Sequence, residues 1–445
     1  MSPQPHIGRT LRKELSDWRR WVGRTLVLVF ASTAGLTVVA FTWLSERALA
    51  AFHVLQSTYW WAPLLWTPFC TMAIAAITRR WLPGIAGSGI PQVIAALEPE
   101  ATGSNRGYFV SLRLSIAKIA MTAWGLLAGL SLGREGPSVQ IAAGVLHHAR
   151  RWIPESARVS DQALLIAGGA AGIAAAFNTP LGGVMFAIEE LSRRPEQRSN
   201  GLVLAAIVFS GLMAVSIYGN ATYFGVIRID GWSTALIWPG LVIAVVSGVL
   251  GGIFSRLMLT SMTPNAKGWC MNLRRNRPIA FAGLCALLIA LMGVTSDGSI
   301  FGSGYMHTRQ LLESGTETFD LFVPFKFLAT WLTTWSGVPG GIFAPSLAIG
   351  GSLGQEVSQW LGVASTPAYI ALGMAGFLAA VTQAPLTAFI IVMEMVDGHA
   401  LVLSLMTCAF VACGVSRFIS VPLYPGLALL QLKRLPAQSQ GIDRN

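Results

Sequence analysis

The chain is predicted to be an all-α membrane protein built from two inverted repeats of broken and tilted helices. Three observations predict this class: a low content of charged residues, long apolar segments and an internal duplication. Hydrophobic residues make up 53% of the 445 residues and charged residues only 11%, whereas a soluble domain carries about 25% charged residues. The composition therefore predicts a polytopic protein in contact with a lipid bilayer, with about 14 to 18 helical segments.

Four apolar segments have nearly the length that crosses a bilayer, which is about 20 residues for a helix. The first segment is long and lacks a small-residue cleavage site, so we expect a retained helix instead of a signal peptide. Many other apolar segments are shorter and end at Gly or Pro, which predicts helices that do not cross alone. The four long segments are Thr25 to Leu44, Leu202 to Tyr218, Ala235 to Phe254 and Leu401 to Val415.

Basic residues cluster at the ends of the apolar segments, and the net charge is +11. Short basic loops stay in the cytoplasm, so we place both termini there, with residues 1–23 as an N-terminal segment and residues 433–445 as a tail. This distribution does not indicate a nucleic-acid partner. The clusters are Arg9 to Arg24, Arg79-Arg80, Arg193-Arg194, Lys267 to Arg277 and Lys433-Arg434.

The sequence carries no signature of a metal site, a disulfide framework or a nucleotide-driven pump. The five cysteines lie in or beside apolar segments without metal-ligand spacing, and His147 and His148 precede two arginines in what we expect to be a solvated loop. Neither a phosphate-binding loop nor an H-E-x-x-H motif occurs. We therefore expect no cofactor, no metal and no enzymatic activity. An intramembrane enzyme that uses paired glutamates is the alternative from another class, and hydrolysis of a lipid or peptide would reveal it.

Three motifs of the first half recur in the same order in the second half. Two repeats with Gly- and Pro-interrupted helices at corresponding places are typical of secondary transporters, in which helix N-termini near the membrane midplane hold an anion. We assign residues 24–225 to the first transmembrane repeat and 226–432 to the second. An odd number of crossings in each half would invert the halves and keep both termini on one side. The matches are Gly87-Ser88-Gly89-Ile90 with Gly302-Ser303-Gly304-Tyr305, Glu135-Gly136-Pro137-Ser138 with Phe343-Ala344-Pro345-Ser346, and Gly168 to Glu189 with Gly373 to Glu394.

The segment Leu132 to Ser138 places Arg134 and Glu135 between glycines inside an apolar stretch. Ionisable residues at membrane depth are costly and usually face a water-filled path or an ion route. The Gly-x-x-Gly-Pro pattern also breaks a helix, which leaves backbone amides free to meet an anion. A carboxylate beside such amides predicts a gate for which an anion and a proton compete. From the residues alone, the alternative is an ion pair between Glu135 and Arg134.

Four motifs in this order resemble the CLC family of chloride channels and chloride/proton antiporters, and the resemblance covers about residues 20 to 430. It is closest to the prokaryotic type without cytoplasmic regulatory domains. It implies chloride transport coupled to protons, carried out by a homodimer in a bacterial inner membrane with one pathway in each subunit. The motifs are Gly87-Ser88-Gly89-Ile90-Pro91, Gly133-Arg134-Glu135-Gly136-Pro137, Gly341-Ile342-Phe343-Ala344-Pro345 and Pro422-Leu423-Tyr424.

The resemblance implies that Ser88, Ile342, Phe343 and Tyr424 bind chloride. The Ser88 hydroxyl and the amides of Ile342 and Phe343 would donate to the anion, and Tyr424 would form the inner gate. From the residues alone, three purely structural roles stay open: a Gly-Ser turn, a tight crossing of helices with small residues, and a tyrosine of the interfacial belt. Serine at position 88 resembles the chloride-selective members, because nitrate-preferring relatives carry proline there and the fluoride-exporting branch departs from the motif.

The resemblance also implies that Glu135 alternates between blocking the path and carrying a proton, while Glu190 takes up protons from the inside. Typical channel members have an apolar residue in place of Glu190, so its presence favours an antiporter over an uncoupled chloride channel. Without that context, Glu189 and Glu190 resemble a charged helix end that Arg193 and Arg194 neutralise. An exchanger of another anion, nitrate or fluoride, is the remaining alternative.

Two further charged residues have no predicted role in transport. Lys118 lies inside the apolar stretch Leu112 to Leu132. In some relatives this lysine faces a glutamate, but here the corresponding residue is Ile94, so the partner of Lys118 stays open and we treat the lysine as structural. Glu394, the repeat counterpart of Glu189, is expected to cap or brace a helix.

Overall fold

The computed structural model describes residues 18–101, 104–154, 159–192, 201–219, 222–224, 236–263, 268–314, 320–363 and 367–433. Among these residues there is no β-strand, and the isolated bridge between Gly133 and Gly341 is the one extended pairing. The same residues form nineteen α-helices, several of only two or three turns. The prediction of an all-α fold with many short helices is confirmed.

The two halves of the chain contain the following elements. The first half holds α2 (Trp18–Thr58), α3 (Ala62–Trp81), η1 (Pro83–Ile85), α4 (Ile90–Leu97), α5 (Ser104–Phe109), α6 (Leu112–Leu127), α7 (Glu135–His148), η2 (Ala149–Arg151), α8 (Asp161–Phe177), α9 (Pro180–Phe186), the π-helical turn η4 (Ala187–Ser192) and α10 (Gly201–Tyr218). The second half holds α11 (Ile237–Met262), α12 (Trp269–Asn276), α13 (Pro278–Thr295), α14 (Tyr305–Ser314), α15 (Phe322–Ser336), α16 (Phe343–Trp360), α17 (Pro367–Thr382), α18 (Pro385–Met395), η6 (His399–Leu401), α19 (Val402–Arg417) and α20 (Leu423–Leu432).

Six helical stretches in the described part of the chain are long and apolar enough to cross a membrane. Four of them, in α2, α10, α11 and α19, contain or overlap the long apolar segments of the sequence. The other two are α13 and the stretch Asn105–Leu127, which includes α6. Helix α2 continues past Leu44 to Thr58 because the intervening residues include neither Gly nor Pro and include several good helix formers.

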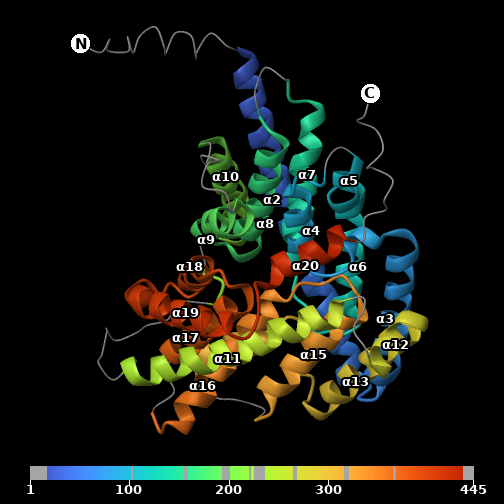
Figure 1. Ribbon diagram of the computed structural model, residues 1–445, viewed down its shortest axis with the longest axis vertical. Helices are drawn as coiled ribbons and strands as arrows, with labels where there is room; N and C mark the ends of the chain where they lie inside the picture. Colours follow the sequence, from blue (N-terminus) through green and yellow to red (C-terminus); the bar gives the residue numbers. More distant parts are fainter. Residues whose placement is uncertain are drawn as a thin grey trace.

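Helices of the two halves interlock at the middle of the molecule (Figure 1). In this view α2, α7, α8 and α10 lie in the upper part, whereas α11, α13, α15 and α16 lie in the lower part. Helix α3 of the first half packs against α13 of the second, and α20 of the second half packs against α4 of the first. The last helix of the second half is therefore placed beside the first motif of the first half.

Small residues allow corresponding helix pairs in the two halves to pack closely. A Cβ added at Gly172 of α8 would collide with the backbone of Ser138 in α7, and one added at Gly373 of α17 would collide with the backbone of Gly350 in α16. Membrane helices depend on such close contacts because no hydrophobic effect drives their association in lipid. The pairs α7–α8 and α16–α17 contain the sequence matches of the internal duplication, so the duplicated sequence forms a duplicated packing unit.

Candidate functional site

Three loops that precede helices meet at the centre of the molecule. The amide of Gly133 donates to the carbonyl of Gly341 at 2.7 Å, and the amide of Gly341 donates back to Gly133 at 2.8 Å. The amide of Gly340 donates to the carbonyl of Gly87 at 3.2 Å. These bonds bring the first residues of α4, α7 and α16 together, so helix ends with unused amides and a positive dipole end converge on one place.

Ser88 lies on the loop before α4 with 4% of its surface exposed. The loop bends between Gly87 and Gly89, whose φ angles of +85° and +111° are accessible mainly to glycine. Gln92 fixes the loop, because its amide nitrogen donates to the carbonyl of Ala86 at 2.5 Å and its oxygen accepts from the amide of Gly89 at 2.9 Å. Ser88 therefore lies in a buried turn that the hydrogen bonds of Gln92 fix, and not in a turn at the surface.

Lys118 holds the same loop from α6. Its buried ammonium donates to the carbonyls of Ile85 at 2.8 Å and Gly87 at 2.6 Å. The partner that the sequence left open is thus the backbone of the loop that carries Ser88. Lys326 makes the same contacts in the second half, with the carbonyls of Ile300 at 2.7 Å and Gly302 at 2.8 Å. The sequence comparison of the two halves did not reveal this second lysine, although it lies at a corresponding place.

Tyr424 approaches Ser88 from α20. It is 1% exposed, and its phenol faces the Ser88 hydroxyl. Neither hydroxyl makes a hydrogen bond of good geometry to any residue that the structure describes. Buried polar groups are rarely left without partners, so two such hydroxyls aimed at one space are the groups expected around a bound anion. The burial of Tyr424 excludes a place in the interfacial belt.

Ile342 and Phe343 stand at the start of α16, and each is at most 2% exposed. As the first residues of a helix, their amides have no carbonyl within that helix to bond. The carbonyl of Ile342 already accepts from the amide of Ser346 at 3.0 Å and from its hydroxyl at 2.7 Å. The carbonyl of Ile342 is thus already hydrogen-bonded, while the amides at this end of the helix stay available to an anion.

Glu135 is the first residue of α7 and is completely buried. The amides of Glu135 and Ala344 point toward its carboxylate, yet neither carboxylate oxygen has a hydrogen bond of good geometry within the described ranges. A Cβ at Gly133 would collide with this carboxylate, so the glycine leaves the space that the side chain occupies. A negatively charged group therefore lies between the N-terminal ends of α7 and α16, where a small anion would also be stabilised.

Arg134 turns away from its neighbour. Its guanidinium forms an ion pair with Glu46 of α2 at 2.8 Å and donates to the hydroxyl of Tyr223 at 3.4 Å. The alternative in which Arg134 is the ion-pair partner of Glu135 is therefore wrong. No sequence motif indicated a role for Glu46, although a lone acid within an apolar helix of this length signals a buried or half-buried partner.

Aromatic rings pack beside Glu135. Phe177 lies 5.2 Å from Phe343 and 5.5 Å from Tyr223, and Tyr223 lies 4.8 Å from Tyr305, measured between ring centroids. The hydroxyl of Tyr305 donates to the carbonyl of Tyr223 at 3.0 Å. These rings join α8, α14 and α16 around the short described stretch 222–224. Their positions on separate helices explain why no local sequence pattern indicated the cluster.

Glu190 lies on the π-helical turn η4 and is 3% exposed. Together with Tyr424, Phe343 and Thr387 it borders a buried constriction that is too narrow to hold a water molecule. Single π-helical turns are rare and occur often at functional sites. Tyr424 interacts electrostatically with both Glu190 and Glu135, so the two predicted glutamates lie near the predicted tyrosine.

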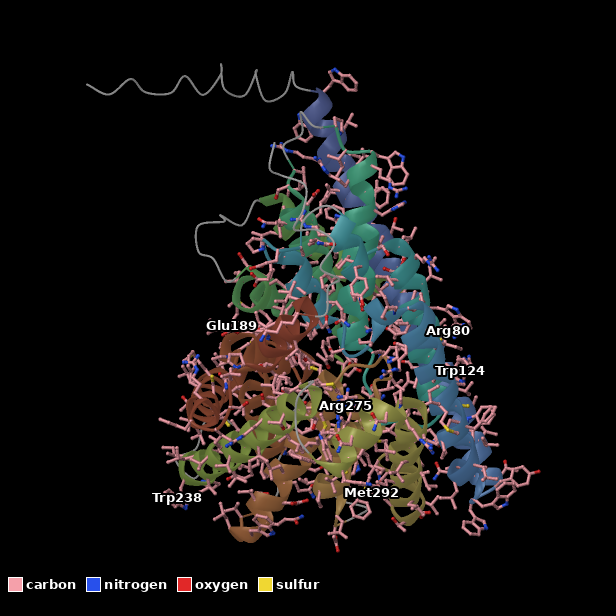
Figure 2. The ribbon with its side chains drawn as sticks, turned by 45° about the vertical axis from the view of Figure 1, so that its right-hand side comes forward. Arg80, Trp124, Glu189, Trp238, Arg275 and Met292 are labelled. Carbon is pink, nitrogen blue, oxygen red and sulfur yellow. The ribbon has the colours of Figure 1, made fainter. Side chains whose placement is uncertain are left out.

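The side chain of Glu189 contacts a different part of the structure from that of Glu190. Its carboxylate accepts from the amides of Leu386 at 3.1 Å and Thr387 at 2.6 Å, the first turn of α18. Glu394 accepts in the same way from Leu181 at 3.1 Å and Gly182 at 2.6 Å, the first turn of α9. Figure 2 shows Glu189 where the green end of the first half meets the red helices of the second. The expectation that Glu394 caps a helix is confirmed, and Glu189 is its counterpart.

Metal and disulfide chemistry have no visible basis in the residues described. No group of three or more His, Cys, Asp or Glu side chains could hold a metal ion there. All five cysteines are free, four of them buried and Cys270 exposed. The titratable side chains that converge at the centre are instead two separate glutamates and a tyrosine.

Comparisons with known proteins agree with this geometry. A family model described as "Voltage gated chloride channel" matches residues 70–417. The H(+)/Cl(-) exchange transporter ClcA of Klebsiella pneumoniae subsp. pneumoniae is 31% identical, with 93% of this chain and 89% of that protein covered. The ClcA protein of Citrobacter koseri is 30% identical, with coverage of 92% and 89%.

Solved structures show the same fold. A slow cyanobacterial Cl-/H+ antiporter superimposes with a TM-score of 0.80 at 21% identity, covering 93% of this chain and 98% of the other. A CLC-type fluoride/proton antiporter gives a TM-score of 0.74 at 22% identity, with 91% and 97% covered. Since the family model spans most of the chain and the relatives match over nearly all of it, the chain belongs to the voltage-gated chloride channel family, the CLC channels and transporters.

Proposed function

We propose that this protein exchanges chloride for protons across a membrane. The observation that carries the proposal is the convergence of two buried hydroxyls that face each other, several helix N-termini and one buried carboxylate at the centre of the fold. The names of its relatives support the same activity, because ClcA proteins of 30–31% identity are H(+)/Cl(-) exchange transporters. The protein is a transporter and not an enzyme.

Chloride binds where the hydroxyls of Ser88 and Tyr424 face each other, and the amides of Ile342 and Phe343 complete the site. These four groups are all donors, and none carries a full charge. Several neutral donors together stabilise a halide without holding it as tightly as a lysine or arginine would, which permits release as well as entry. The hydroxyl of Ser88 favours chloride over nitrate and fluoride in this assignment.

Glu135 is the gate. Its carboxylate occupies the space between the ends of α7 and α16, where the same amides and dipoles would also stabilise chloride. Two anions do not share one small site, so chloride displaces the carboxylate. The displaced side chain takes up a proton, loses its charge and no longer competes. Chloride and proton occupancy therefore exclude each other, and this exclusion couples the two fluxes.

Glu190 supplies protons from the other side of the site. It borders the same narrow constriction as Tyr424 and Phe343, so a proton that reaches Glu190 lies close to the central anion site. A chain with an uncoupled chloride pathway has no use for a buried carboxyl at this place. The burial of Glu190 therefore favours exchange over an uncoupled channel, which is the second candidate.

The remaining assignments follow from the charge distribution and the family. Both termini lie in the cytoplasm, because the short loops with arginine clusters stay there, and the protein resides in a bacterial inner membrane. It works as a homodimer with one pathway in each subunit, and it needs no cofactor because chloride and protons are its substrates. An exchanger of fluoride or nitrate shares the fold, and ion competition distinguishes these substrates.

The test is proton movement in proteoliposomes that contain the purified protein, with a chloride gradient and equal pH on both sides. We expect protons to move uphill and to reverse direction when the chloride gradient is reversed. Chloride flux without proton movement would identify an uncoupled channel. Retained proton exchange with fluoride or nitrate, and none with chloride, would correct the substrate.

A further inference from the structure

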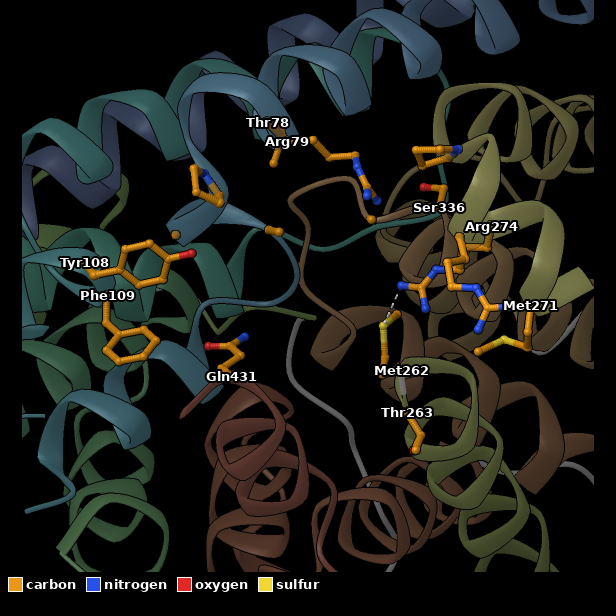
Figure 3. Close-up of a pocket in the computed structure, with 16 residues that line it drawn as sticks. Thr78, Arg79, Tyr108, Phe109, Met262, Thr263, Met271, Arg274, Ser336 and Gln431 are labelled. Atoms are coloured by element: carbon orange, nitrogen blue, oxygen red, sulfur yellow. Dashed lines mark hydrogen bonds between the residues drawn. The ribbon is translucent and has the colours of Figure 1, made fainter. Parts of the chain in front are cut away.

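A cavity of about 440 Å³ lies outside the central site, among α3, α12, α15 and α20. It contains three arginines, which are Arg79 at the end of α3 and Arg274 and Arg275 on α12. Figure 3 shows Arg79 and Arg274 reaching into the hollow from different helices, with Tyr108 and Gln431 on the facing side. Among the described residues that line it, none is acidic. The cavity therefore presents an excess of positive charge to whatever enters it.

Arg274 is held by the fold, whereas Arg79 and Arg275 are exposed. Arg274 donates to the carbonyl of Ser261 at 2.7 Å and to the sulfur of Met262 at 3.2 Å, which fixes α12 against the end of α11. Arg275 donates to Asn272 at 2.8 Å, so its side chain follows the surface of α12. Since arginine side chains lose much rotamer entropy when they are fixed, the anchored guanidinium group of Arg274 is prepared for an anion, and the exposed Arg79 and Arg275 are free to turn toward it.

The walls of this cavity are the loops that carry the anion site. Ala86 lines it and directly precedes Gly87 and Ser88, while Gly337 lines it and lies three residues before Gly340. Gln431 lines it from α20, and Tyr424 is the second residue of the same helix. The cavity is therefore adjacent to the central site on the face with the basic loops, the one that we assign to the cytoplasm.

We propose that this cavity binds phosphate-bearing anions and that a bound phosphate obstructs the chloride pathway. The volume falls within the range of about 300–1,000 Å³ that small-molecule sites occupy, far more than a single halide needs. Guanidinium groups match phosphate oxygens with paired hydrogen bonds. The Tyr108 hydroxyl and the Gln431 amide add neutral hydrogen-bonding groups. The obstruction rests on the proposed chloride transport, whereas the binding itself does not.

Obstruction follows from the difference in size between the two sites. The space around Tyr424 and Glu190 is lined by buried side chains and is too narrow to hold a water molecule, whereas the cavity among the arginines has about 440 Å³. A phosphate group with two or more charges would need to lose its hydration to enter there, which is costly. It would instead stay among the arginines, in front of the loops that lead to Ser88.

The experiment measures chloride efflux from proteoliposomes with less than one transporter per vesicle on average, in the presence of inorganic pyrophosphate. Because the protein inserts in both directions, external pyrophosphate should stop only the vesicles whose basic face is outside, about half of the active ones. Pyrophosphate on both sides should stop nearly all. Arg79→Gln and Arg275→Gln should each raise the half-inhibiting concentration about tenfold.

Arg80→Gln and Arg277→Gln are matched controls, because these exposed arginines are sequence neighbours that do not line the cavity. Inhibition that is equal in all four variants, or chloride efflux that millimolar pyrophosphate does not change, would overturn the proposal. If the unaltered protein does not transport chloride, the proposed function fails, and calorimetric binding of pyrophosphate to the purified protein then decides this inference alone. Heat of binding that Arg275→Gln abolishes supports the site, and its absence in the unaltered protein refutes it.

Discussion

Glu189 and Glu394 provide a matched pair for testing how the two repeats are joined. Each carboxylate bonds two amides in the first turn of a helix from the other half, at 3.1 and 2.6 Å in both cases. Replacing either glutamate with Ala removes a cap, which costs about 0.5–2 kcal/mol. The lost negative charge at a helix N-terminus adds about 0.3–1 kcal/mol, less where the amide is exposed, as at Leu181.

We therefore expect Glu189→Ala and Glu394→Ala to lower the free energy of unfolding by similar amounts, about 1–2 kcal/mol each. Glu189→Gln and Glu394→Gln keep an oxygen acceptor and lose only the charge, so they should cost less than half as much. The measurement is reversible unfolding of the purified protein in mixed detergent and dodecyl sulfate, followed by tryptophan fluorescence. A double Ala variant should lose roughly the sum, because the two caps share no partner.

Transport separates capping from proton transfer. Glu394 lies far along the chain from Glu190, so Glu394→Ala should keep the proton-to-chloride ratio even if it lowers stability. Glu189→Ala should change the ratio only as far as the shifted turn η4 moves Glu190. The reasoning is refuted if one Ala variant is destabilised by less than about 0.3 kcal/mol while the other loses its full cap, or if Glu394→Ala abolishes proton coupling.

Three other substitutions test the central site. Glu135→Ala should remove proton movement and leave passive chloride flux in proteoliposomes, and any pH-dependent proton exchange that survives would contradict its role as the gate. Glu190→Ala should slow coupled proton uptake on the order of a hundredfold while chloride permeation continues; intact coupling would move the proton entry elsewhere. Gly136→Ala places a Cβ against the Ser88 hydroxyl, so chloride binding by calorimetry should weaken at least about tenfold. Gly201→Ala, whose added Cβ meets no atom within 4 Å, should bind chloride normally, and equal losses in both variants would contradict the assignment.

Much of the fold follows from patterns that are local in the sequence. Apolar length and the lack of charge predicted the membrane class and the spans in α2, α10, α11 and α19. The span that includes α6 was less clear, because Arg106, Arg113 and Lys118 interrupt its apolar character. A charged residue inside an apolar stretch argues against a membrane span unless a partner for its charge can be named. The partner of Lys118 is a backbone loop 31 to 33 residues away in the sequence.

The internal duplication was visible only where it rests on glycine and proline. Those residues recur because a broken helix needs them in both halves. The duplicated lysines, Lys118 and Lys326, and the reciprocal caps of Glu189 and Glu394 depend on contacts between elements, so the sequence alone identified at most one member of each contact. The structure supplied the other member.

The sequence by itself determined the membrane class, the repeat and Glu135 as a candidate gate, because apolar length, helix breaks and a buried charge are local features. Its resemblance to the CLC family added Ser88, Ile342, Phe343 and Tyr424 as candidates. Tertiary structure alone decided which of these groups share a space, that Arg134 bonds Glu46 and not Glu135, and that Glu189 and Glu190 point to different targets. The physical reason is that adjacency along a chain fixes which groups are present, whereas their partners are chosen by how distant helices pack. The π-helical turn η4 shows this difference. Its neighbouring residues Glu189 and Glu190 differ in role because Glu189 caps a helix end, whereas Glu190 borders a buried constriction beside Tyr424.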